Sequence, residues 1–154
     1  MTTPDHRTLP ALWQAGHPAA GRAVLPTGHA PLDATLADGG WPRGALSELL
    51  VPTPGSGELP LLMPALAAHV RDGGWVVLVS PPYVPCAGAW LAGGIDTRRL
   101  LWLTPADARA WLWSTEQAAR TPGCAVLAWP HRHPAGMREL RRLQLAAQQG
   151  DGLC

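Results

Sequence analysis

Four short, continuous apolar runs limit what this chain can fold into, because segments of helix length separate them. The apolar runs are residues 45–51, 75–79, 100–103 and 124–129. The segments of helix length are residues 58–71, 84–93, 105–120 and 134–149. Strands that are apolar throughout, rather than at alternate positions, are typical of a parallel sheet covered on both faces. The alternation predicts an α/β domain with a mainly parallel β-sheet and right-handed crossovers.

Composition is typical of one folded domain in a reducing compartment. The chain has 154 residues, of which 47% are hydrophobic and 15% charged, and a net charge of +1. This excludes a disordered chain and an overall field that attracts nucleic acid or membranes. Three widely spaced cysteines predict neither a disulfide framework nor a metal site. With no signal peptide and no run of about 20 apolar residues, we expect a cytoplasmic protein.

We divide the chain into two parts, and two local signals help to place its helices. Residues 1–25, rich in proline, glycine and alanine, are expected to form an N-terminal arm, and residues 26–154 the domain. Thr104 followed by Pro105 predicts a helix N-terminus, with the hydroxyl as the cap. Pro64 removes a backbone hydrogen bond, so we expect it to kink its helix or to delay the start.

The segment before the first predicted helix has the layout of a phosphate-binding loop without its charged groups. The loop and the residue that follows it are Pro52, Thr53, Pro54, Gly55, Ser56, Gly57 and Glu58. Such a loop needs lysine where Glu58 stands and serine or threonine where Leu59 stands. All twelve basic residues of the chain are arginine, and the two prolines remove two N–H donors. Glu58 stabilises the helix through its dipole but opposes a bound phosphate.

Two further positions lack the groups that an ATPase requires. An aspartate should end a later strand and hold magnesium, but residues 124–129 end in Trp129. Ser80-Pro81-Pro82 follow residues 75–79 and offer no glutamate to activate water. The sequence therefore predicts a protein that is not an enzyme, with no catalytic residues, no bound cofactor and no metal site. His131 and His133 are expected to be ordinary loop histidines.

Three arginines and one tryptophan are candidates for contact with DNA or a partner protein. Arg138, Arg141 and Arg142 share a helix face at spacings of three and four, which suits contact with phosphates or an acidic partner. A solvated face is the alternative that we favour for them. Trp41 lies in a Gly-Gly-Trp-Pro-Arg-Gly turn and is expected at the surface. Most other tryptophans, including Trp102, are expected to fill the core.

Several motifs resemble known proteins of the DNA-damage response. Residues 25–33 (LPTGHAPLD) and 39–49 (GGWPRGALSEL) resemble the start of the RecA core. The amino-acid sequence of residues 75–83, 101–105 and 141–147 resembles the ImuA family. The resemblance implies a RecA-like three-layer domain with a degenerate nucleotide-binding loop. It also implies a non-catalytic accessory role in SOS-induced, error-prone translesion DNA synthesis. The partners implied are an ImuB-like Y-family polymerase homologue and a second, DnaE-type polymerase subunit, with DNA as a further ligand.

The sequence departs from the ImuA pattern at one point, and two alternative functions are considered. ImuA proteins continue with another strand after the helix at 134–149, whereas this sequence ends at Cys154, so we expect an incomplete, unpaired sheet edge. The first rival is a SulA-like cell-division inhibitor that binds the FtsZ ring protein. Residues 47–49 and 103–105 suit it, but the long lead-in at 26–44 fits ImuA and RecA better. The second rival, a working RecA-type ATPase, is opposed by the loop.

Overall fold

The computed structural model describes residues 23–36, 38–130 and 135–154. Of the arm predicted at 1–25, residues 1–22 lie outside these ranges. The strands are β1 (Val24–Leu25), β2 (Trp41–Pro42), β3 (Trp75–Val79), β4 (Leu100–Leu103) and β5 (Cys124–Ala128). The helices are α1 (Ala30–Asp33), α2 (Glu58–Arg71), α3 (Ala87–Ala92), α4 (Ala108–Arg120) and α5 (Met137–Gly150), with a 3-10 turn, η2, at Thr97–Arg99. No helix in these described stretches is long and apolar enough to cross a membrane.

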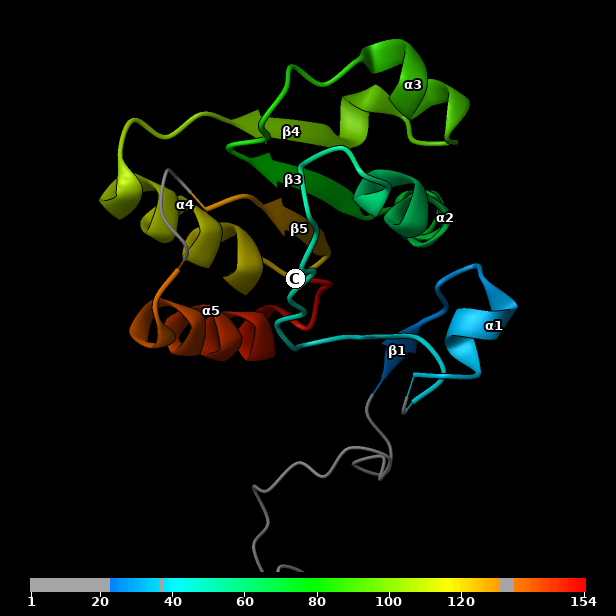
Figure 1. Cartoon of the computed structure of the whole chain (residues 1–154), viewed down its shortest axis with the longest axis horizontal. Helices are drawn as coiled ribbons and strands as arrows, with labels where there is room; N and C mark the ends of the chain where they lie inside the picture. The colour runs from blue at the N-terminus through cyan, green and yellow to red at the C-terminus, as the bar shows by residue number, and fades with distance from the viewer. Residues whose placement is uncertain (1–22, 37, 131–134) are drawn as a thin grey trace, which may run out of the picture.

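A three-stranded parallel sheet forms the centre of the domain, in the order β4-β3-β5 (Figure 1). Val77 of β3 is paired in register with Leu101 on one side and with Val126 on the other. The predicted α/β class and parallel sheet are therefore confirmed. Three of the four predicted strands are present, and β4 has the predicted bounds.

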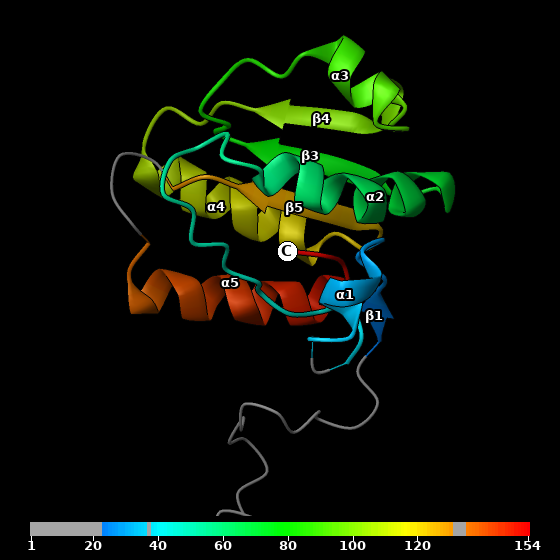
Figure 2. The ribbon, with the colours of Figure 1, turned by 45° about the vertical axis from the view of Figure 1, so that its right-hand side comes forward.

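Alternate residues of β3 enter two separate hydrophobic cores. Val76 and Leu78 pack with Leu66 of α2, and this core also contains the buried Trp90 of α3. Val77 and Val79 pack in the other core, with residues of α4 and α5. The sheet is therefore the middle of three layers, with α2 on one face and α4, beside α5, on the other (Figures 1 and 2). Each buried aliphatic side chain contributes about 1.5–3 kcal/mol to this packing.

The lead-in segment folds against the first of these cores as a small unit of its own. β1 and β2 pair antiparallel, with Leu25 opposite Trp41, and α1 lies between them in sequence. The backbone N–H of the buried Thr27 donates to Asp33 Oδ1 at 2.9 Å. A Cβ atom at Gly40 would lie 2.6 Å from the carbonyl oxygen of Leu25, so the close approach of this turn requires glycine.

The predicted strand at 45–51 is not part of the sheet, which is the main correction to the sequence analysis. Ala45 forms an isolated parallel bridge with Leu153, and Ser47 N–H donates to the carbonyl oxygen of Cys154 at 2.7 Å. Leu153 in turn accepts the N–H of Val126 at 2.8 Å. Residues 152–154 thus lie between β5 and the segment at 44–47 and take the pairing position expected for the predicted strand. From Glu48 onward the segment runs outside the sheet.

Two helix starts also differ from the predictions. The cap of α4 is Asp107, whose side chain accepts the N–H of Ala110 at 2.7 Å, and not Thr104. A carboxylate is as good a cap as a hydroxyl, and this one lies at the residue before the first turn. Pro64 lies inside α2, which nevertheless begins at Glu58, so the proline does not delay the helix.

The division of the tryptophans into buried and exposed side chains differs from the prediction. Trp41 is 6% exposed and packs in the core with Leu25, so its expected place at the surface is wrong. Trp75 and Trp102 are 42% and 44% exposed, and Trp113 on α4 is 62% exposed, so these three do not fill the core. Trp102 lies on β4, which among the described residues is an edge strand of the sheet, and this is consistent with its exposure.

Candidate functional site

The segment predicted to be a degenerate phosphate loop is an exposed turn that leads directly into α2. Residues 51–57 are exposed, whereas Glu58, the first residue of the helix, is only 8% exposed. Gly55 and Gly57 have φ angles of 87° and 126°, which favour glycine. Gly57 is the residue before the helix and provides no side-chain cap. Pro60 has no N–H, so three N–H groups at the start of the helix, those of Gly57, Glu58 and Leu59, have no acceptor within it.

The carboxylate of Glu58 folds back onto the loop in front of the helix. Its Oε1 accepts the backbone N–H of Gly55 at 2.6 Å. This bond, helped by the N–H groups of Glu58, Gly57 and Ser56, lowers the pKa of Glu58 against the opposing effect of burial. The side chain thus occupies the position at a helix N-terminus that attracts anions. A phosphate and this carboxylate would compete for the same N–H groups.

The other two positions inspected for ATPase groups lie at the ends of neighbouring strands. Trp129 directly follows β5, and its N–H donates to the carbonyl oxygen of Val79 at 3.0 Å. Ser80 follows β3, and its N–H donates to the carbonyl oxygen of Leu103 at 2.9 Å. These residues thus continue the sheet ladder with their backbones and bring no carboxylate to its edge. The described residues contain no group of three or more His, Cys, Asp or Glu side chains placed to hold a metal.

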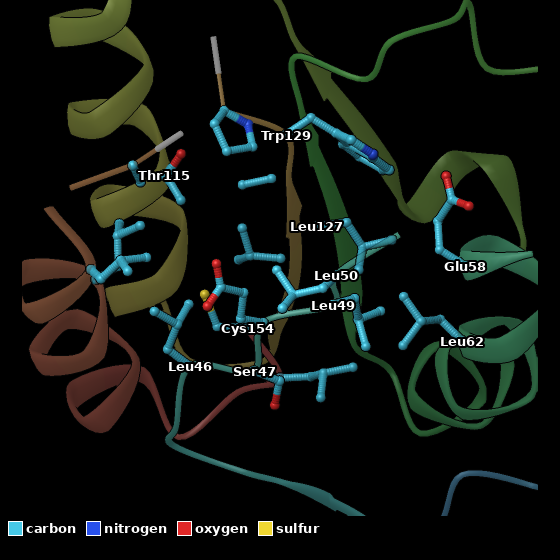
Figure 3. A pocket seen from close by; sticks show the side chains of 18 of the residues that line it. Leu46, Ser47, Leu49, Leu50, Glu58, Leu62, Thr115, Leu127, Trp129 and Cys154 are labelled. Atoms are coloured by element: carbon cyan, nitrogen blue, oxygen red, sulfur yellow. The ribbon is translucent and has the colours of Figure 1, made fainter. Parts of the chain in front are cut away.

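A groove that the sequence analysis missed lies beside the loop. It is a cavity of about 580 Å³. Its lining residues are Trp41, Leu46, Ser47, Glu48, Leu49, Leu50, Val51, Glu58, Leu62, Trp111, Thr115, Val126, Leu127, Ala128, Trp129, Pro130, Ala135, Leu140, Leu143, Leu153 and Cys154. Figure 3 shows Glu58 and Leu62 of α2 on one side, Thr115 of α4 on the other, and Leu127 of β5 between them.

The groove exists because residues 48–51 run outside the sheet. Leu49, Leu50 and Val51 are 37%, 87% and 39% exposed and form part of its wall. The same residues were predicted to be a buried strand. The sequence signal that could have indicated the groove was the concentration of apolar residues directly before a loop rich in glycine and proline. That signal alone does not show whether the apolar residues can pair with the edge of a neighbouring strand or remain outside the sheet.

Three of the buried polar atoms that lack a hydrogen-bond partner within the described residues belong to this lining. They are Nε1 of Trp41, Nε1 of Trp111 and Oε2 of Glu58. Buried polar groups are nearly always paired, so each such group needs an explanation. The two indoles can only donate and the carboxylate can only accept.

The three arginines of the predicted face lie on α5 but make different contacts. Arg138, Arg141 and Arg142 are exposed on α5. Arg142 makes a two-point contact with the buried Glu116 of α4, at 2.9 and 2.6 Å. Arg138 and Arg141 instead line a shallow hollow beside Glu48. The structure does not bring Trp41, which is buried, to this face, and the histidines at 131 and 133 lie outside the described residues.

Comparison with solved structures relates this chain to a known protein. No protein-family model and no curated protein matches the chain. Among solved structures, SulA from Pseudomonas aeruginosa is 30% identical, with a TM-score of 0.55. The match covers 70% of this chain and 91% of that one. The assignment to ImuA in particular rests on the motifs alone. The chain therefore belongs to the family of SulA-related α/β proteins.

Proposed function

We propose that this chain is a non-catalytic, protein-binding domain of the bacterial SOS response that inhibits cell division by binding FtsZ, as SulA-like inhibitors do. The observation that carries the proposal is the match to SulA, because 30% identity extends over nine-tenths of that protein. This favours the division inhibitor over translesion synthesis, which the motifs alone suggested. A cytoplasmic location belongs to the same proposal, since FtsZ acts there.

The state of the loop supports a role without catalysis. Nucleotide hydrolysis in a phosphate loop needs a cationic side chain and a bound magnesium ion close to the phosphates. Here Glu58 accepts the N–H of Gly55, and the prolines at 52 and 54 offer no N–H. Binding of ATP would require the carboxylate to leave and would then place two anions together. We infer that the chain acts through its surface.

Translesion synthesis is the second candidate, and the folded lead-in segment favours it. The residues that resemble RecA and ImuA, from Leu25 to Gly44, form the unit that packs on the core through Trp41. In this case the domain is RecA-like in detail and binds an ImuB-like polymerase homologue and a DnaE-type subunit. Arg138 and Arg141 are then the residues available for DNA or partner contact. Replacing both with alanine should weaken that binding and reduce its salt dependence.

One set of binding assays separates the two candidates. The purified chain is mixed with FtsZ, and polymer sedimentation and GTP hydrolysis are measured. We expect suppression of both at equimolar concentration, together with filamentous cells when the chain is expressed in bacteria. In parallel, immobilised chain is offered the ImuB-like protein. Unaffected FtsZ polymers with recovery of the ImuB-like protein would replace the first function by the second. Loss of both interactions would contradict the proposed protein-binding role.

A further inference from the structure

The outer edge of β5 is paired along only part of its length. Val126 N–H donates to the carbonyl oxygen of Leu153, whereas Trp129, three residues later, donates its N–H on the other side, to Val79. Backbone groups of a strand alternate between its two sides, so Ala128 points its N–H to the same side as Val126. Within the described residues no backbone acceptor is present for Ala128 on this side. A short stretch of open strand edge therefore lies in the lining of the groove.

The walls around this edge are suited to an apolar guest that also carries positive charge. Most lining residues are aliphatic or aromatic, with Leu62 on the α2 side and Leu143 on the α5 side. The charged side chains of the lining are Glu48 and Glu58, and none of the described residues in it is an arginine. Glu48 lies beside Arg138 and Arg141 of the adjoining hollow. The uncompensated negative charge of the lining is therefore at Glu58, and that end of the groove attracts a cationic group.

The open backbone edge at Ala128 defines what the guest must provide. Trp41 Nε1, Trp111 Nε1 and Glu58 Oε2 are buried beneath the lining, so the guest meets the strand edge and not these three atoms. An extended peptide presents carbonyl oxygens and N–H groups along its whole length, and strand addition to an open edge uses the same groups. A hydrocarbon chain would fill the volume but leave the outward N–H of Ala128 without an acceptor.

We propose that the groove is a docking site for one extended, apolar segment of a partner protein, added to β5 as a parallel strand beyond Val126 and ending in a basic residue near Glu58. The proposal rests on the proposed protein-binding function and identifies the surface that performs it. The basic residue belongs at the C-terminal end of the segment. A parallel strand runs towards Trp129, and Glu58 lies towards that end of the groove in Figure 3.

A blocked hexapeptide tests the site without the partner. The probe alternates valine and leucine and ends in arginine, and one control has alternate backbone nitrogens methylated. We expect calorimetry to show binding that methylation weakens at least about tenfold, since each lost strand hydrogen bond contributes up to a factor of ten. A second control, with glutamate replacing the arginine, should bind more weakly for reasons of charge. Equal binding of the methylated peptide would overturn the proposal and leave an apolar pocket only.

Two variants and one matched control locate the binding on this surface. Leu50→Asp removes an exposed apolar side chain from the groove wall, and Leu91→Asp makes the same change at an exposed position on α3. We expect the first to weaken peptide binding at least about tenfold and the second to leave it unchanged. Ala128→Pro removes the outward N–H and should also weaken binding. Hydrogen exchange at Ala128, slowed at least about tenfold by the peptide, provides a readout without mutation.

The same variants distinguish failure of the site from failure of the proposed function. If FtsZ binds the wild-type chain and Leu50→Asp leaves that binding unchanged, the groove is not the docking site although the function stands. If the peptide binds and FtsZ does not, the site stands and another protein is its partner. Dimerisation of the chain that Leu50→Asp abolishes would assign the groove to a second copy and overturn the proposal.

Discussion

Two buried glutamates differ in the groups that contact their carboxylates. One lies at the N-terminus of α2 and the other between α4 and α5. Glu116 is 4% exposed and both of its oxygens accept hydrogen bonds from Arg142. Glu58 is 8% exposed, and one oxygen is held by backbone N–H while the other has no partner within the described residues. A fully paired carboxylate joins two helices, whereas a half-paired one faces a groove. The contrast separates a structural contact from a candidate site.

The largest expected effect is on the fully paired glutamate. Arg142→Ala leaves Glu116 buried without its cation, and we expect Tm to fall by about 5 °C. The effect is limited because the arginine side chain itself is half exposed. Differential scanning calorimetry measures it. Arg138→Ala on the same helix is the control and should change Tm by no more than about 1 °C; equal losses in the two variants would show that the pair contributes nothing.

A smaller effect is expected for Glu58→Gln. The variant keeps an acceptor but loses the charge at the helix N-terminus, so we expect about 1 kcal/mol of destabilisation at pH 7. Urea unfolding of the two proteins gives the difference. Glu48→Gln removes an exposed charge from the same groove and should have less effect. A larger loss for the Glu48 variant would mean that the loop does not hold the Glu58 carboxylate.

The same variant gives a pH dependence of known sign. The pKa of Glu58 is lowered in the folded state from its ordinary value of 4.5. Its carboxylate therefore stabilises the fold fully above that value, and the contribution is lost as the pH falls through the lower folded pKa. The stability difference between wild type and Glu58→Gln should be constant from pH 7 to about 6 and should shrink below about 4. A difference that grows on acidification would contradict the lowered pKa.

The smallest effect is a difference between two thiols. Burial raises the pKa of Cys154, in the groove lining, to about 11, whereas Cys86 is exposed. At pH 8 iodoacetamide should alkylate Cys154 at least about tenfold more slowly than Cys86, because the thiolate is the nucleophile. Variants that retain one cysteine each allow the rates to be followed by mass spectrometry. Equal rates in the folded protein would mean that water enters this part of the groove freely.

The sequence predicted elements well where one kind of contact determines them. The run at 100–103 became β4 with the predicted bounds, and the helix expected at 58–71 is α2. In both, local periodicity and hydrophobicity point to the same structure. The position of Glu58 was also predictable, because a carboxylate at a helix N-terminus is attracted by the N–H groups in front of it.

The sequence-based prediction was wrong where two segments of the chain compete for the same strand edge. The run at 45–51 has the pattern of a buried strand, but Leu153 pairs with Val126 in its place. No local pattern records that competition, and the groove that results from it was missed. Trp41 shows the same limit, since a turn was expected at the surface and its side chain instead packs beneath it in the core.

Calorimetric titration of the wild-type chain with Mg-ATP tests the central claim most directly. The claim is that the Glu58 carboxylate occupies the anion position at the N-terminus of α2 in this SulA-related domain, so that the preceding loop does not bind a nucleotide. The account predicts no binding tighter than about 1 mM, which corresponds to about −4.1 kcal/mol. Binding in the micromolar range would contradict it, because the loop would then hold a phosphate despite its own carboxylate.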